Sequence, residues 1–223
     1  MKRDPGGGLP VRAGAEKPKT DQRNSGMVKS DAISDERLIE RSRNGDSQAF
    51  QLLVEKYEGM VAATVIGMLG RGPEAEDVGQ ETFIRFHGAL ERFRGDSTVG
   101  TYLTRIAINQ SLKAIRKRKR FISRFTSSDA EEIDLPDDSV DPDCTYEEAE
   151  KRELVHDALQ RLGPEHRAVV VLRMLRELST KETAQMLGLP VGTVMSRLSR
   201  ALEKLEMLLA PVVRESVKTG DEY

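Results

Sequence analysis

One segment near the C-terminus concentrates side chains that suit nucleic-acid binding. Hydroxyl and basic residues recur there at i, i+3, i+4, i+7 and i+11, which places them on one face of a helix. Hydroxyls and a helix N-terminus bind phosphates, and arginine pairs with the edge of guanine in the major groove. The candidate residues are Thr193, Ser196, Arg197, Arg200 and Lys204. We therefore expect a helix that reads duplex DNA.

A short helix should precede this face and position it. Ser179 with Glu182 three residues later predicts a capping box at a helix N-terminus, and Gly188 predicts the end of that helix. An apolar stripe accompanies the basic face of the second helix, formed by Val194, Leu198, Ala201, Leu202 and Leu205. Two helices joined by so tight a turn predict a helix-turn-helix. An ordinary amphipathic surface helix with solvated arginines is the alternative.

A basic segment in the middle of the chain offers a second candidate surface. A long helix is expected from about residue 101 to 120, after a loop over 93–100. Its polar face carries Asn109, Lys113, Arg116 and Arg120 at i, i+4, i+7 and i+11. Its apolar stripe consists of Ile108, Leu112 and Ile115. One face can therefore bind a nucleic-acid strand while the adjacent face packs, although a solvated basic helix end would look similar.

A third face mixes polar and apolar side chains. Gln80, Glu81 and Ile84 lie three, four and seven residues after Asp77, so all four share one side of a helix that Pro73 can begin. Such a face suits a helix of a partner protein, although a solvated helix face has the same pattern.

The elements that position these faces are all helical, and no strand pattern occurs in the sequence. We expect an all-α fold of two small helical domains joined by an acidic flexible linker, the second domain containing the helix-turn-helix. The expected segments are a disordered tail over 1–30, a helical domain over 31–125, an acidic linker over 126–149, a helical domain over 150–212 and a C-terminal tail over 213–223.

Composition narrows the function without naming it. The net charge of −2 conceals a basic block at 113–124 followed by an acidic stretch at 129–153. The three histidines are scattered, Cys144 is the single cysteine, and no glycine-rich phosphate loop follows a strand. We therefore expect no catalytic residues, no metal site and no cofactor.

No apolar run approaches a membrane span and no signal peptide is recognisable, so we expect a cytoplasmic protein without direct membrane insertion.

Three motifs in a fixed order resemble a known family. Residues 35–57 (DERLIERSRNGDSQAFQLLVEKY) are similar to the opening of the extracytoplasmic-function (ECF) sigma factors of bacterial RNA polymerase. Residues 75–120 resemble their second conserved region, and residues 163–205 resemble their fourth. The resemblance covers about three quarters of the chain. It implies a protein that binds core RNA polymerase, recognises promoter DNA and directs promoter opening without catalysing a reaction itself.

The resemblance also implies roles for particular residues. The helix with DVGQETFIRF would dock on the clamp helices of the polymerase β′ subunit through Asp77, Gln80, Glu81, Ile84 and Arg85. Tyr102 stands where the family usually has tryptophan and would stack on an unpaired base of the minus-ten element, unless it is a core aromatic. Asn109 would hold a flipped non-template base, with Lys113, Arg116 and Arg120 beside it. The C-terminal helix would read the minus-thirty-five element.

The family pattern implies further partners, and the chain departs from it at three positions. The β flap of the polymerase and an anti-sigma factor are the expected partners besides β′ and promoter DNA. Lys113, Val99 and Met195 differ from the usual family residues, so the base preference of this chain should differ too. Two other interpretations stay open: a free-standing helix-turn-helix regulator, and a sigma relative that acts as a signalling partner. A hydrolase or nuclease using the acidic pairs is a third.

Overall fold

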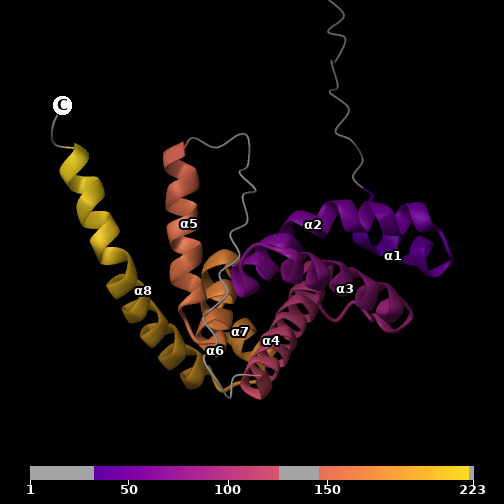
Figure 1. The fold of residues 1–223 in the computed structure, drawn as a ribbon. Coiled ribbons are helices and arrows are strands. Elements are labelled where there is room, and N and C mark those ends of the chain that lie inside the picture. Colours follow the sequence, from indigo (N-terminus) through magenta and orange to yellow (C-terminus); the bar gives the residue numbers. More distant parts are fainter. Residues whose placement is uncertain (1–32, 126–145, 221–223) are drawn as a thin grey trace, which may run out of the picture. The chain divides into compact units, whose positions relative to one another are not determined.

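The computed structural model describes residues 33–125 and 146–220, with side chains for 33–124 and 150–210. These residues form helices and their connections, and no strand occurs among them, which confirms the predicted all-α class (Figure 1). The elements are α1 (Asp35–Arg43), α2 (Ser47–Leu69), α3 (Pro73–Ala89), η1 (Leu90–Arg92), α4 (Val99–Phe125), α5 (Tyr146–Gln160), α6 (Pro164–Val170), η2 (Val171–Leu175), α7 (Thr180–Leu187) and α8 (Val191–Gly220).

Helical structure extends beyond both limits expected for the second domain, residues 150 and 212. Helix α5 begins at Tyr146, inside the segment predicted as linker, and α8 runs to Gly220, well past the domain end expected at residue 212. The predicted tail over 1–30, Cys144 and most of the predicted linker lie outside the described residues.

Local sequence explains how α2 begins. Asp46 is its N-cap: the carboxylate accepts a hydrogen bond from the Ala49 amide at 3.1 Å, which satisfies one of the free N–H groups of the first turn. Arg41 pairs with the same carboxylate at 2.8 Å, and its hydrogen bond lowers the pKa of Asp46. The helix then continues through the exposed Gly59 as one 23-residue element, since packing outweighs the cost of about 1 kcal/mol for a helical glycine.

The first helical region is built around α2, which packs against α1, α3 and α4. Its buried face meets Phe86 of α3 and Leu103 and Ile108 of α4, all of which are at most 1% exposed. Figure 1 shows α3 and α4 lying beside α2 in this region. The outer faces of α3 and α4 are thereby left to solvent.

The second region consists of α5 to α8. Helices α5, α6 and α8 pack through a cluster of Leu159, Leu162, Val170 and Ala201, with Leu198 and Leu205 against it. A smaller cluster of Val169, Ala184 and Val194 joins α6, α7 and α8. The apolar stripe predicted for the last helix is thus the side of α8 that faces its own domain, except for Leu202, which is 40% exposed and belongs to neither cluster.

The two regions share a core along α2. Ala168, Val171 and Leu172 of the second region belong to the same buried cluster as Val65 and Met68 of α2. Gly67 permits this approach: a β-carbon placed there would lie 3.1 Å from a methyl carbon of Val171 and 3.2 Å from one of Leu175. The π-helical element η2 is therefore in direct contact with α2.

Candidate nucleic-acid and partner-binding surfaces

The α7–α8 pair has the predicted helix-turn-helix chemistry. The Ser179 hydroxyl accepts a hydrogen bond from the Glu182 amide at 3.2 Å, and the Glu182 carboxylate accepts one from the Ser179 amide at 2.8 Å. These bonds stabilise the carboxylate and lower the pKa of Glu182. Gly188 ends α7 in the left-handed conformation, with φ of 65°, where a side chain would be strained. The capping box and the glycine end predicted from sequence are both present.

The structure divides the five residues predicted to read duplex DNA into two groups. Ser196 and Arg200 are exposed, and Thr193 is partly buried at the first turn of α8. The Arg197 side chain is only 24% exposed and forms an ion pair with Glu165 of α6. Lys204 is exposed, but its ammonium donates to the Arg161 carbonyl at 2.7 Å. Two of the expected cations are thus bound within their own domain.

Further exposed side chains lie between the apolar stripe and the polar face of α8. Val191, Met195 and Ser199 are exposed and alternate along the helix with Ser196 and Arg200. From sequence, Met195 stood out only as a departure from a family pattern, and Val191 and Ser199 were not among the predicted site residues. Their signal was the helical spacing of four residues from 191 to 195 and 199, which runs beside the apolar stripe.

Helix α4 presents the predicted basic face. Asn109, Lys113, Arg116 and Arg120 are all exposed, whereas Ile108 and Ile115 are 1% and 3% exposed on the opposite side. Another cation of the segment, Arg118, points elsewhere and pairs with Glu74 of α3 at 3.1 Å. The face expected to bind a strand and the stripe expected to pack are therefore separate in space.

Tyr102 lies two turns of α4 before Asn109, on the same side of the helix. Its ring packs edge-on against Phe93, with centroids 5.2 Å apart, and against Phe86 at 6.0 Å. The residue is half-buried in this aromatic cluster, which also contacts Phe50 through Phe86. An aromatic so held is rigid and keeps part of its ring at the surface.

The outer face of α3 carries the residues predicted to meet a partner helix. Asp77, Gln80 and Ile84 are exposed, and Ile84 is 65% exposed although it is a large apolar side chain. Glu81 and Arg85 form an ion pair at 2.7 Å along the same helix. Within the described residues, no ion pair joins this face to another helix.

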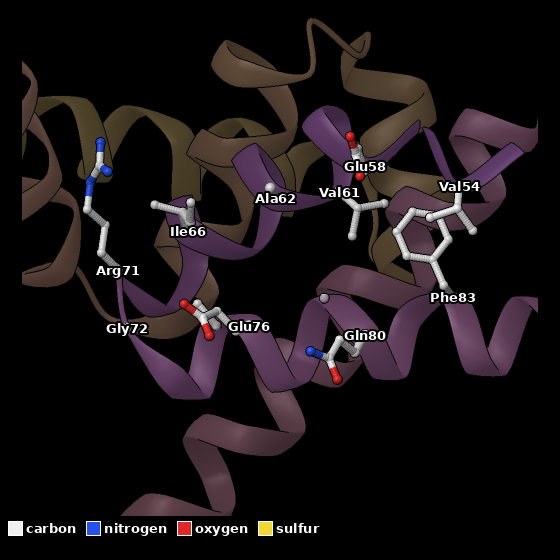
Figure 2. Close-up of a pocket in the computed structure, with 12 residues that line it drawn as sticks. Val54, Glu58, Val61, Ala62, Ile66, Arg71, Gly72, Glu76, Gln80 and Phe83 are labelled. Carbon is white, nitrogen blue, oxygen red and sulfur yellow. The ribbon is translucent and has the colours of Figure 1, made fainter. Parts of the chain in front are cut away.

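A groove of about 450 Å³ separates α2 from α3 beside this face. Figure 2 shows Ala62 and Ile66 of α2 on one wall, and Glu76, Gln80 and Phe83 of α3 on the other. The floor is apolar, while charged groups stand at the rim. Gln80 thus belongs both to the groove and to the exposed face of α3.

The described residues contain no group of three or more histidine, cysteine, aspartate or glutamate side chains arranged to hold a metal ion. Within the same residues, no helix is both long and apolar enough to cross a membrane.

Comparisons with known proteins agree with this architecture. The Sigma-70 region 2 family matches residues 53–121, and the Sigma-70 region 4 family matches residues 152–205. The RNA polymerase sigma-H factor of Pseudomonas aeruginosa is 37% identical over 187 residues, which cover 82% of this chain and 97% of that protein. The ECF RNA polymerase sigma-E factor of Escherichia coli is 35% identical over 193 residues, which cover 83% of this chain and 99% of that protein.

Solved structures show the same fold. CnrH, determined in complex with the cytosolic domain of CnrY, has a TM-score of 0.54 and 26% identity, covering 81% of this chain and 99% of that chain. The sigma factor RpoE of Bartonella quintana, determined with the anti-sigma factor NepR, has a TM-score of 0.57 at 23% identity, covering 72% of this chain and 96% of that chain.

A helix-turn-helix region and a helical region with a basic α4 face, matched by the two Sigma-70 families in this order, define a transcription initiation factor. The chain belongs to the ECF family of RNA polymerase sigma factors.

Proposed function

We propose that this sigma factor binds core RNA polymerase and the two promoter elements through three separate exposed helical faces. The α3 face, defined by Asp77, Gln80, Glu81, Ile84 and Arg85, binds core RNA polymerase. The α4 face, defined by Asn109, Lys113, Arg116 and Arg120 together with Tyr102, binds the minus-ten element. The α8 helix binds the minus-thirty-five element. The supporting observation is that these faces lie on separate helices, each backed by buried residues.

Core binding through α3 follows from its mixed chemistry. A 65%-exposed Ile84 beside an apolar groove favours burial against a protein partner rather than against DNA. The groove between α2 and α3 suits the side chains of a helix that lies along it, and Gln80 can anchor such a helix by hydrogen bonds. The clamp helices of the β′ subunit are the proposed partner.

The exposed basic face of α4 is the observation that supports binding of a single DNA strand in the minus-ten element. Eleven residues separate Asn109 from Arg120, which is about 16 Å along a helix, or about five nucleotides at the rise of B-form DNA. Three cations along this length suit a strand backbone, and the amide of Asn109 offers both a donor and an acceptor to a flipped base. The rigid ring of Tyr102 provides a stacking surface nearby.

Duplex binding is assigned to α8, with its N-terminal half in the major groove, as in other helix-turn-helix proteins. Arg200 and Ser196 contact the DNA there directly, whereas Thr193 lies near the phosphates at the helix N-terminus. Arg197 and Lys204 contact phosphates at the edge of this surface, with their positions fixed by Glu165 and by the Arg161 carbonyl.

We further propose that a protein inhibitor controls this factor. CnrH was determined in complex with the cytosolic domain of CnrY, and the RpoE factor with an anti-sigma factor. An anti-sigma factor that covers the groove between α2 and α3 would compete with the polymerase. The second region would contact the β flap of the polymerase. The factor acts in the cytoplasm and has no catalytic activity of its own, because the polymerase performs the chemistry.

Run-off transcription with purified core polymerase on a genomic library tests the main proposal. Specific transcripts should appear only when the factor is present. Asn109→Ala should bind core normally but lose strand opening, measured by permanganate reactivity of unpaired thymines. Gln110→Ala, which removes a neighbouring amide on another side of α4, is the matched control. A folded factor that yields no specific transcript with active core would overturn the proposal, and loss of core binding in Asn109→Ala would show that the surfaces are misassigned.

A further inference from the structure

Two apolar side chains stand exposed where α8 begins. Val191 is 46% exposed and Met195 is 60% exposed, one helical turn apart. Neither belongs to the buried clusters that hold α8 against its domain. The N-terminal residues of the second helix of a helix-turn-helix are the ones that contact base edges in the major groove. An apolar pair therefore occupies a base-reading position.

Met195 lies on the exposed side of α8, next to the apolar stripe and beside polar residues. Ser196, Ser199 and Arg200 are exposed beside it. On the flanks, Arg197 pairs with Glu165 and Lys204 donates to the Arg161 carbonyl, so these cations lean toward their own domain. The face of α8 that is free to contact bases therefore lies toward Met195 and Ser199, and away from Arg197 and Lys204.

An acid limits how far along α8 this face extends. Glu203 is exposed and accepts a hydrogen bond from the Ser199 hydroxyl at 3.1 Å. A carboxylate is repelled by DNA phosphates, so on the side of α8 that Glu203 occupies, close contact is favourable only before this residue; Lys204 lies on the other flank, beside the Arg161 carbonyl. Residues 191–200 are left to contact the bases, and Met195 lies in the middle of them.

The chemistry of the major groove decides what such a residue can recognise. All four bases present hydrogen-bonding atoms there, and a thioether side chain would cover these atoms without replacing their bonds to water. Thymine alone presents a methyl group, which gains by contact with an apolar side chain. Methionine is flexible and polarisable enough to adapt to that group.

We propose that Met195, supported by Val191, contacts the C5-methyl group of a thymine in the minus-thirty-five element and so selects that base. This inference rests on the proposed placement of α8 in the major groove. It makes Met195 a specificity-determining residue in a position where a cation would instead bind phosphate or guanine.

Deoxyuridine provides the test, because it differs from thymidine only by the missing methyl group. On a promoter recovered by run-off transcription, each thymine of the minus-thirty-five element is replaced by deoxyuridine in turn, and holoenzyme binding is measured. One replacement should weaken binding by about threefold to fourfold, the equivalent of about 0.8 kcal/mol for one buried methyl-sized group. Holoenzyme with the Met195→Ala variant should bind the thymidine promoter and that deoxyuridine promoter equally.

Met207→Ala is the matched control, since Met207 is 71% exposed on the same helix but outside residues 191–200. It should keep the full sensitivity to deoxyuridine. Met195→Lys should lose the thymine preference and make binding more salt-dependent. Equal binding of the wild type to every substituted promoter, or unchanged sensitivity in Met195→Ala, would overturn the inference. Absence of any transcript from the wild type would instead count against the proposed function.

Discussion

The guanidinium of Arg167 donates a hydrogen bond at 2.5 Å to the backbone carbonyl of Met68, which lies 99 residues earlier in the chain. Met68 is in the last turn of α2, where carbonyl groups lack partners within the helix. The same guanidinium donates to the carbonyls of Gln160 and Leu162, where α5 ends, and to the Gln160 side chain. One side chain thus caps the C-termini of two helices from different regions.

Helix dipoles explain why a cation is tolerated at this buried position. Arg167 is 5% exposed, and burial, with a smaller contribution from Arg118, lowers its pKa to about 10. It therefore remains charged at neutral pH. The carbonyl ends of α2 and α5 carry partial negative charge, which offsets the cost of removing the guanidinium from water.

Arg167→Met should lower the free energy of unfolding by about 2–4 kcal/mol, because buried carbonyl groups of both helices lose their donor. Arg167→Lys should recover part of the loss, since an ammonium keeps the charge but reaches fewer acceptors. Chemical denaturation measures both variants. Arg161→Met, at an exposed side chain nearby, should change stability by less than about 0.5 kcal/mol. Equal effects at 161 and 167 would contradict the capping role.

Two alanine substitutions in α2 should have opposite effects. Gly59 is exposed, and no atom lies within 4 Å of the position that a β-carbon would take, so Gly59→Ala should stabilise the protein by about 0.5–1 kcal/mol through helix propensity. Gly67→Ala should destabilise it by about 1–2 kcal/mol, since Val171 and Leu175 must shift to admit the methyl group. Thermal unfolding of the two variants tests the packing of α2 against η2. If both were stabilised equally, that packing would be absent in solution.

The stability of the protein should fall as the pH drops below about 6.5, in part because of His156. Burial, and after it the charge of Arg71, lowers the pKa of this histidine below its ordinary value of 6.5. Between the folded-state pKa and 6.5, the unfolded chain therefore binds a proton that the folded protein does not. His156→Gln should show a shallower decline over this range in denaturation experiments at stepped pH. Identical pH dependence in the two proteins would contradict the assignment.

Arg200 and Arg197 should contribute unequally to promoter binding. Arg200 is exposed and makes no ion pair among the described residues, so Arg200→Ala should weaken holoenzyme binding to the minus-thirty-five element by about 1–3 kcal/mol, which corresponds to roughly fivefold to 150-fold. Arg197→Ala should cost less, since its guanidinium is held by Glu165. Fluorescence anisotropy with labelled promoter DNA compares them. A larger loss in Arg197→Ala would mean that the ion pair orients a direct DNA contact.

The parts of the structure that were predictable from sequence depend on local chemistry. Ser179, Glu182 and Gly188 lie within ten residues of one another, and their hydrogen bonds and dihedral preference act within a single helix. The exposed face of α4 was predictable for the same reason, because the spacing of Asn109 and Arg120 fixes their side of the helix.

What the sequence did not reveal depends on contacts between distant segments. Nothing near Arg197 indicates that Glu165, 32 positions earlier, would hold it, and nothing near Tyr102 specifies its packing against Phe93. Arg167 had a faint signal, a lone cation opening the apolar run from Ala168 to Leu172. The structure was also needed to show that Met195 is exposed while the neighbouring Arg197 and Lys204 are held by groups of their own domain.

The cap at Arg167 also affects how this protein can change over evolution. Two of its acceptors are the backbone carbonyls of Met68 and Leu162, and every amino acid supplies a carbonyl. Replacing the side chain at either position leaves the acceptor in place, so drift there requires no matching change at residue 167. The link between the two regions should therefore leave no paired pattern of substitutions in related sequences. It would persist as a single arginine whose partners vary freely.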